Sequence, residues 1–165
     1  MAQYEDRLDR DLNRLGRRVG TLGQASRDAL AGAIQAFLGR DVNLANEVVV
    51  GDPEINRRAQ HLDHLCHLFV ARHLPSAGHL RFVSSVLRVG KTLERIGDYS
   101  ETISRATARL EKSVPEEVAS DVEMLGNHAQ ELLGQSLEHF GERNSEGARS
   151  TIAMCGQFGA TFDKV

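Results

Sequence analysis

A helical spacing of apolar residues runs through the sequence and leaves few choices of fold. In the first stretch, Leu8, Leu12, Leu15, Val19 and Leu22 are separated by steps of four and three. This spacing places them on one face of an α-helix, and no alternating pattern typical of a β-strand competes with it. Similar steps return in two later stretches, at Ile55, Ala59, Leu62, Cys66 and Phe69, and at Phe82, Val86, Val89, Leu93 and Ile96. We therefore expect an all-α protein.

The spacing predicts five helices, at about 3–38, 53–73, 76–111, 116–140 and 143–163. Pro53, Pro75 and Pro115 are each expected near a helix N-terminus, because proline fits the first helical turn. Breaks are expected at 39–41 and at 51–53, where glycine stands close to aspartate or proline. Long helices joined by short turns form an antiparallel helical bundle.

An internal repeat divides the chain into two parts. A shift of 103 residues aligns Leu30 with Leu133, Ile34 with Leu137, Phe37 with Phe140, Asp41 with Asn144, and Val49 with Ile152. We expect tandem three-helix units, a first at 1–112 and an incomplete second of two helices at 113–165. Two helices cannot hide an apolar face by themselves, so either the chain is shortened, or another copy covers the face, or the C-terminal part rearranges. A homodimer is the expected state.

Composition narrows the class of function. The chain has 20 Lys and Arg against 23 Asp and Glu, a net charge of -3, so no overall positive field favours nucleic acid. The N-terminus is charged and no apolar stretch is long enough to span a membrane, which predicts a cytoplasmic protein. Cys66 and Cys155 form no CxxC pair, so the sequence suggests neither a disulfide framework nor a zinc knuckle. Phosphate-binding loops and nucleophile elbows are absent, so no catalytic residue is assigned.

The run KTLERIGDYSETISR at 91–105 carries three carboxylates on one helix face. Glu94, Asp98 and Glu101 lie opposite the apolar residues of the same helix. Like charges four residues apart repel each other, so a hard cation or a ferric ion would stabilise them. The alternative is a solvated face, because Lys91 and Arg105 stand at the right spacing for ordinary surface ion pairs.

The run HLDHLCH at 61–67 contains several residue types that bind metals. Its three histidines are spaced by three and drift around the helix, so they do not converge. Asp63 and His67 do share a face, and a metal there would need further ligands from a facing helix. The alternative places Cys66 in the core and the histidines at the surface.

The stretch at 48–103 carries a set of short sequence marks. They are Gly51, Asp52, Ile55 and Asn56 of a GD..IN turn, Asp63 and Cys66 of the next helix, Pro75, Ala77, Leu80, Arg81 and Val83, and LERIGD from Leu93 to Asp98. With these marks the stretch resembles the first repeat of the PhoU phosphate-signalling family. The resemblance implies paired three-helix bundles without enzymatic activity. It implies an adaptor that links a phosphate ABC transporter to a sensor histidine kinase and represses the phosphate-starvation response. Contact with the membrane would come only through these partners.

Some members of that family bind iron, zinc or other cations through ExxxD or DxxxD motifs. Carried over by position, the implied metal ligands are Glu94, Asp98 and Asp63. Ala59 stands where a further carboxylate is expected. His67 or His79 could supply nitrogen ligands, which would favour zinc or nickel. Two alternatives stay open, a divalent-metal-binding helical protein and a paralogue that regulates another anion transporter.

Overall fold

The protein folds into five helices over the residues that the structure describes. The computed structural model describes residues 2–162, and side chains over 3–156. The helices are α1 (Ala2–Gly39), α2 (Val42–His73), α3 (Ala77–Thr107), α4 (Glu116–Glu142) and α5 (Ser145–Phe162). The all-α prediction is confirmed, and no strand occurs within this described part.

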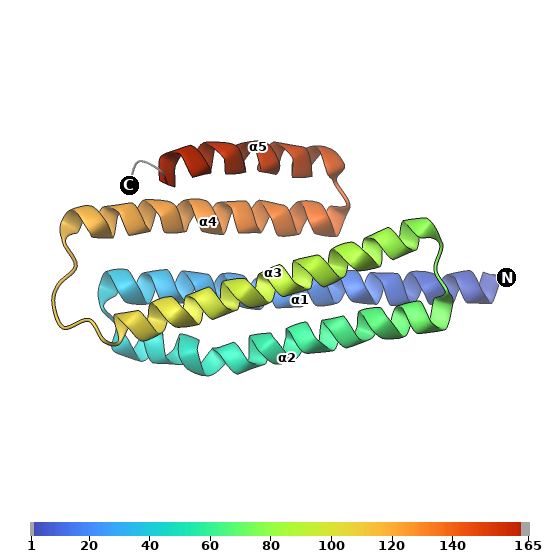
Figure 1. Ribbon diagram of the computed structural model, residues 1–165, viewed down its shortest axis with the longest axis horizontal. Helices are drawn as coiled ribbons and strands as arrows, with labels where there is room; N and C mark the ends of the chain where they lie inside the picture. The colour runs from blue at the N-terminus through green and yellow to red at the C-terminus, as the bar shows by residue number, and fades with distance from the viewer. Residues whose placement is uncertain (1, 163–165) are drawn as a thin grey trace.

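Helices α1, α2 and α3 pack against one another as a three-helix bundle, and α4 and α5 lie along one side of it (Figure 1). The buried apolar cluster that fills the bundle consists of Leu8, Leu12, Leu15, Val19, Leu22, Ile55, Leu62, Cys66, Phe69, Val83, Val86 and Leu93. The spacing predicted all of them except Val83, and the predicted Ala59, Phe82, Val89 and Ile96 are only partly buried against the cluster. The core therefore lies between α1, α2 and α3.

The predicted break at 51–53 is wrong, because α2 begins eleven residues earlier, at Val42, and continues through Pro53. The side chain of Asp41 caps this earlier start by accepting hydrogen bonds from the backbone N–H groups of Asn43 and Leu44, at 2.9 and 3.0 Å. Ala45 is fully buried in the first turns. The cap and the burial of these turns stabilise the helix, and this offsets the free energy lost with the hydrogen bond that a proline inside a helix removes.

The turn between α1 and α2 has the same geometry as the turn between α4 and α5. Arg40 and Arg143 both have positive φ, 52° and 56°. Asp41 and Asn144 each donate their backbone N–H to the carbonyl five residues earlier, at 3.0 and 2.9 Å. Each also accepts, on its side chain, the backbone N–H three residues later, at 3.0 and 2.9 Å. All these positions differ by 103, so the structure confirms the register of the sequence repeat.

The contact between α1 and α4 follows the same register. A Cβ atom at Gly23 of α1 would meet the side chain of Leu137 on α4. Conversely, a Cβ at Gly126 of α4 would lie 2.7 Å from Cδ1 of Ile34 on α1. Gly23 and Gly126 are equivalent in the repeat, and so are Ile34 and Leu137. The two helices therefore meet through a local two-fold arrangement, each glycine receiving the other helix's large side chain.

Helix α5 has a single neighbour. It packs against α4 and against no other described helix, whereas α4 also packs against α1. Within the described residues, no helix is long and apolar enough to cross a membrane.

Candidate functional site between α2 and α3

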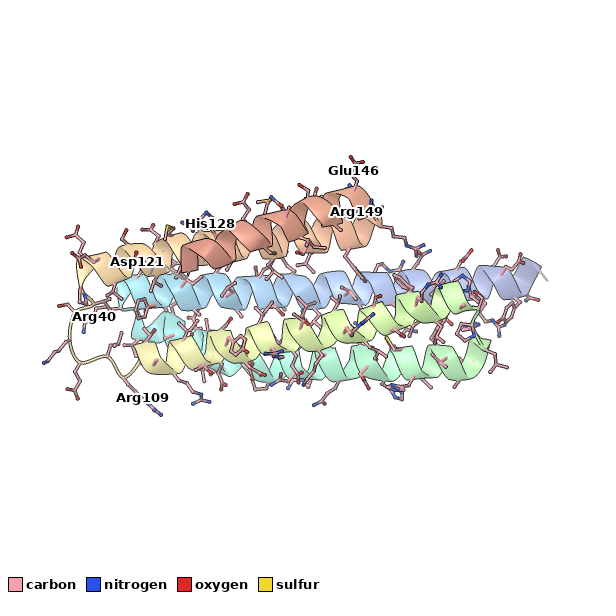
Figure 2. The ribbon with its side chains drawn as sticks, turned by 45° about the horizontal axis from the view of Figure 1, so that its top comes forward. Arg40, Arg109, Asp121, His128, Glu146 and Arg149 are labelled. Carbon is pink, nitrogen blue, oxygen red and sulfur yellow. The ribbon has the colours of Figure 1, made fainter. Side chains whose placement is uncertain are left out.

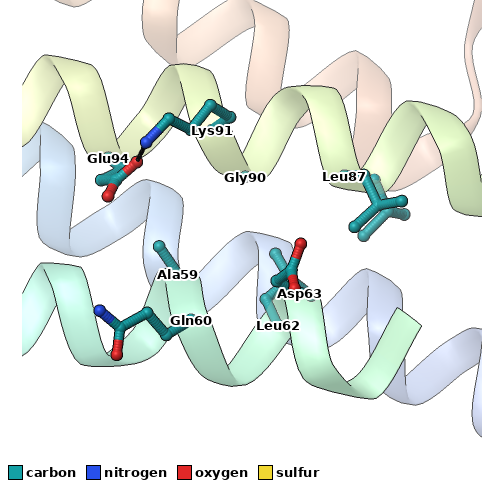
Figure 3. A pocket seen from close by; sticks show the side chains of 9 residues that line it. Ala59, Gln60, Leu62, Asp63, Leu87, Gly90, Lys91 and Glu94 are labelled. Carbon is teal, nitrogen blue, oxygen red and sulfur yellow. Dashed lines mark hydrogen bonds and ion pairs between the residues drawn. The ribbon is translucent and has the colours of Figure 1, made fainter. Parts of the chain in front are cut away.

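A pocket of about 220 Å³ opens between α2 and α3, halfway along the bundle (Figure 3). Asp63 comes from the α2 wall, and Lys91 and Glu94 come from the α3 wall. Gly90 lets the two helices approach closely, since a Cβ there would lie 3.0 Å from Leu62 Cδ2. The pocket therefore brings two of the three predicted metal ligands, Asp63 and Glu94, to facing walls.

Both of these carboxylates have a basic residue beside them on their own helix. Glu94 forms an ion pair with Lys91, drawn as the dashed line in Figure 3. Asp63 lies 3.2 Å from Nδ1 of His67, and both side chains are more than half exposed. An exposed pair such as that of Asp63 and His67 contributes about 0 to 1 kcal/mol, so a stronger ligand could displace it.

The third predicted ligand, Asp98, lies one helical turn beyond Glu94 and does not line this pocket. Its neighbour Glu101 is held by Arg105, whose Nε and Nη2 donate to Oε1 of Glu101 at 2.9 and 2.6 Å. The pairs with Lys91 and Arg105 that the sequence allowed are thus both formed. Among the described residues, Asp98 makes no ion pair.

Asp52 and Asn56 of α2 form a buried polar pair that sequence reasoning did not assign to the site. Asn56 Nδ2 donates to Asp52 Oδ2 at 2.8 Å. The other side-chain oxygen of each residue is buried and has no hydrogen-bond partner among the described residues. Gly97 of α3 lies directly opposite, since a Cβ there would be 3.5 Å from Asp52 Oδ1. A carboxylate of α2 therefore lies beneath the acidic face of α3.

Burial raises the pKa of the Asp52 carboxyl above its ordinary value, and repulsion from Glu101, Asp98 and Glu94 raises it further, although the hydrogen bond from Asn56 opposes the shift. Desolvation and like charges both disfavour a carboxylate. The acidic region between α2 and α3 therefore carries an electrostatic strain that a cation or a proton would relieve.

Replacement of Asp52 by asparagine is expected to stabilise the chelator-treated protein at pH 7.5. The raised pKa means that the ionised Asp52 destabilises the fold at pH values above its folded pKa, and the penalty disappears as pH falls towards the unfolded value. We expect the Tm to rise by roughly 2 to 4 °C, which corresponds to about 1 kcal/mol in a protein of this size. The increase should shrink towards pH 4.

Thermal unfolding followed by circular dichroism at several pH values measures this effect. Glu123→Gln, at an exposed position of α4, is the matched control and should change the Tm little at any pH. A Tm increase for Asp52→Asn that is equal at pH 4 and pH 7.5 would contradict the assignment of strain to the charge.

The remaining candidate metal ligands stand apart. His79 lies 15 residues before Glu94 on the same helix, about 22 Å along its axis, so the two cannot share a cation. Burial, and after it the charge of Asp63, raises the pKa of the Cys66 thiol to about 11, so Cys66 is a core residue and not a thiolate ligand. In the described part of the chain, no group of three or more His, Cys, Asp or Glu is arranged to hold a metal ion.

Comparison with known proteins identifies the fold and the family together. The PhoU domain model matches residues 19–107, which is more than half of the chain. The chain belongs to the PhoU family. The matched region contains α2, α3 and the acidic region between them, so the resemblance seen in the LERIGD and GD..IN motifs is confirmed.

The curated relatives are phosphate-specific transport system accessory proteins named PhoU. The protein from Edwardsiella tarda is 29% identical over 79% of this chain, and so is that from Escherichia coli K12. A homolog from Rhizobium meliloti is 27% identical over 90% of the chain. This chain spans about half the length of the first two, 54%.

A solved PhoU structure has the same arrangement of helices. The crystal structure of the phosphate transport system regulatory protein PhoU from Streptococcus pneumoniae matches with a TM-score of 0.86 and 25% identity. The match covers 95% of this chain and 74% of that chain. The helical bundle is therefore the PhoU bundle, and the matched chain contains a further part that has no counterpart here.

Proposed function

We propose that this chain is a non-enzymatic accessory protein of a phosphate transport system and acts in the cytoplasm. Membership of the family carries the proposal, because the matching curated relatives have this role in their names. The sequence has no catalytic constellation that would suggest turnover of a substrate. Phosphate status would then pass through protein contacts.

The proposed mechanism is a shift between two states of a protein assembly. The chain binds a phosphate ABC transporter and a sensor histidine kinase, and it favours the silent kinase when phosphate is plentiful. Such coupling is reciprocal, so the kinase must also change the affinity of the chain for the transporter. The acidic face of α3, with Glu94, Asp98 and Glu101 on one side of the helix, is the proposed contact surface.

Deletion of this chain tests the regulatory role. Cells without it are expected to produce alkaline phosphatase in phosphate-rich medium at the level of phosphate-starved cells, because the kinase is no longer silenced. A plasmid copy should restore repression. Normal repression in the deletion strain would show that the chain does not carry this signal.

A charge reversal on the acidic face is expected to weaken repression. Asp98→Lys changes an exposed residue that makes no ion pair in the described structure, so the fold should remain intact. Glu123→Lys makes the same charge change at an exposed position of α4. In the complemented deletion strain, phosphatase activity should rise with Asp98→Lys and stay repressed with Glu123→Lys. Equal activity of the two variants would place the contact surface elsewhere.

A metal-binding role is a second proposal, supported by the facing carboxylates of Asp63 and Glu94. These two residues would hold iron, zinc or another divalent or trivalent cation whose remaining ligands are water molecules, because Asp98, the third implied ligand, does not line the pocket. The cation would neutralise the acidic region and link α2 to α3. Among the described residues, one buried side-chain oxygen each of Asp52 and Asn56 has no hydrogen-bond donor, which supports the proposal of a cation in this region.

Metal content of protein purified without chelator tests the second proposal. Plasma mass spectrometry should find a stoichiometric cation in the wild-type protein. The double variant Asp63→Asn with Glu94→Gln should lose it while keeping its helical circular dichroism spectrum. Metal-free wild-type protein with an intact fold would count against a cation site and leave the regulatory proposal unaffected.

A further inference from the structure

The first half of α1 carries a row of exposed arginines along one side. The row consists of Arg7, Arg10, Arg14, Arg17 and Arg18. With about 3.6 residues per turn, these side chains fall within about 100° of one another and extend about 16 Å along the helix axis. Within the described residues, none of them forms an ion pair. This surface, the basic flank, is locally positive although the chain has a net charge of -3.

The four acidic residues in the same half of α1 do not neutralise the basic flank. Glu5 and Asp9 point to the opposite side of the helix, and Asp6 stands at the edge of the flank. Asp11 lies closer to the arginines, but its Oδ2 is 2.8 Å from Nε2 of His73, which is 4% exposed. Positive and negative charges are therefore separated around this helix.

Helix α2 extends the basic flank. Arg72 is exposed, makes no ion pair among the described residues, and lines one small cleft together with Arg14 of α1. Leu65 and Leu68 line the same cleft and are only partly buried. Arginines with apolar side chains between them fit the boundary of a lipid bilayer, where phosphate groups lie next to acyl chains.

An exposed leucine stands where this surface ends. Leu74, in the turn between α2 and α3, is 88% exposed and has a positive φ of 43°. Glycine is the usual residue in this conformation after a helix, so leucine here both strains the backbone and exposes apolar surface to water. Tyr4 of α1 borders the same turn and donates its hydroxyl to the backbone carbonyl of His73. A contact outside the described structure would bury Leu74 and offset these two costs.

These features share the end of the bundle that α4 and α5 leave free. The beginning of α1 and the turn between α2 and α3 project beyond the turn between α4 and α5 (Figure 1). Figure 2 shows the same arrangement from another side, with Glu146 and Arg149 marking the beginning of α5. The basic flank also lies on the opposite side of α1 from Gly23, through which α1 contacts α4. An extended surface can therefore reach the flank without meeting α4 or α5.

We propose that this end of the bundle binds the surface of a membrane that contains anionic lipids. The arginines contact the lipid phosphates, and Leu74 enters the boundary between headgroups and acyl chains, with Tyr4 beside it. Tyrosine is common at this boundary because its ring is apolar and its hydroxyl is polar. Lipid is favoured over nucleic acid, since a nucleic-acid backbone offers Leu74 no apolar layer. The proposal goes beyond the accessory role, which requires contact with the membrane only through partners.

Sedimentation with protein-free vesicles measures this binding and needs no transporter or kinase. Wild-type protein should bind vesicles of equal parts phosphatidylglycerol and phosphatidylcholine, and much less to phosphatidylcholine alone. Arg14→Glu with Arg18→Glu should bind roughly thirtyfold more weakly, because each arginine near an anionic surface contributes about a factor of five. The matched control is Arg109→Glu with Lys112→Glu, which makes the same change in net charge at two exposed positions after α3. This control should bind like the wild type.

The variant Leu74→Gly separates the apolar contact from the fold. Glycine adopts positive φ without strain, so the Tm should be unchanged or slightly higher. Vesicle binding should nevertheless weaken by about tenfold, because the leucine no longer enters the bilayer boundary. Undiminished binding of this variant would overturn the role of Leu74.

Three results would overturn the membrane proposal itself. They are a wild-type protein that does not bind anionic vesicles, equal binding to neutral and anionic vesicles, and equal binding of the two double variants. A DNA duplex serves as the competing polyanion. If the wild-type protein binds the duplex through Arg14 and Arg18 but binds no vesicle, the basic flank belongs to nucleic acid. Because only purified protein and lipid are present, each of these results leaves the phosphate-signalling role unaffected.

Discussion

Replacement of Leu22 by alanine is expected to destabilise the protein by about 3 to 5 kcal/mol. Leu22 is completely buried in the cluster between α1, α2 and α3. Removing its side chain gives up apolar burial and leaves a cavity that a closed three-helix core cannot fill. A loss of this size lowers the Tm by roughly 10 °C in a chain of this length.

The repeat offers a matched control at Leu125, which occupies the position of Leu22 in the second unit. Leu125 is only partly buried, because no third described helix packs over α4 and α5. Leu125→Ala should therefore cost less than half as much as Leu22→Ala. Both changes are measured by urea unfolding. Equal losses would show that the second unit is as closed as the first.

Much of the fold could be predicted from the sequence because the signals are local. The steps of four and three predicted all five helices, and the ends of α1, α3, α4 and α5 fall within four residues of the prediction. The turn at 39–41 was also found, since aspartate after glycine provides the cap. These features depend on neighbours in the chain and are visible without knowledge of tertiary contacts.

The error at Pro53 has a tertiary cause. A proline usually marks the start of a helix, and here the residues before it are held in α2 by a cap at Asp41 and by the buried Ala45. The glycines inside the helices differ in the same way, by their tertiary surroundings. A Cβ at Gly23, Gly32, Gly90 or Gly97 would meet another helix, whereas Gly16 and Gly20 have open space around them.

The candidate site was only partly visible in the sequence. Spacing and family resemblance named Asp63 and Glu94, and the structure places them on facing walls of one pocket. Spacing on one helix could not show that Asp98 lies outside that pocket. Asp52 was missed, although it stands three residues before Ile55 and so continues the apolar face of α2. The signal that could have revealed Asp52 was a carboxylate at the helical spacing of the buried apolar residues.

Replacement of Gly126 by leucine is expected to loosen the contact between α4 and α1 by about 1 to 3 kcal/mol. Gly126 is buried, and the Cβ of a larger residue there would lie 2.7 to 3.2 Å from three side-chain carbons of Ile34. Ile34 is itself 7% exposed, and its branched side chain leaves little room for adjustment. Gly141→Leu is the control on the same helix, because nothing lies within 4 Å of a Cβ at Gly141. It should be neutral or slightly stabilising, since leucine favours helix more than glycine does.

The double variant Gly126→Leu with Ile34→Ala tests whether the two residues form one contact. Truncating Ile34 alone should cost stability, but in the double variant the new leucine occupies the space that Ile34 leaves. The combined loss should therefore be smaller than the sum of the single losses by roughly 0.5 to 3 kcal/mol, measured by urea unfolding. The repeat allows a second test of the same kind, because Gly23 and Leu137 form the equivalent contact on the other side of the local two-fold axis. Gly23→Leu with Leu137→Ala should show coupling of the same sign, and strictly additive losses at both sites would contradict the two-fold packing of α1 on α4.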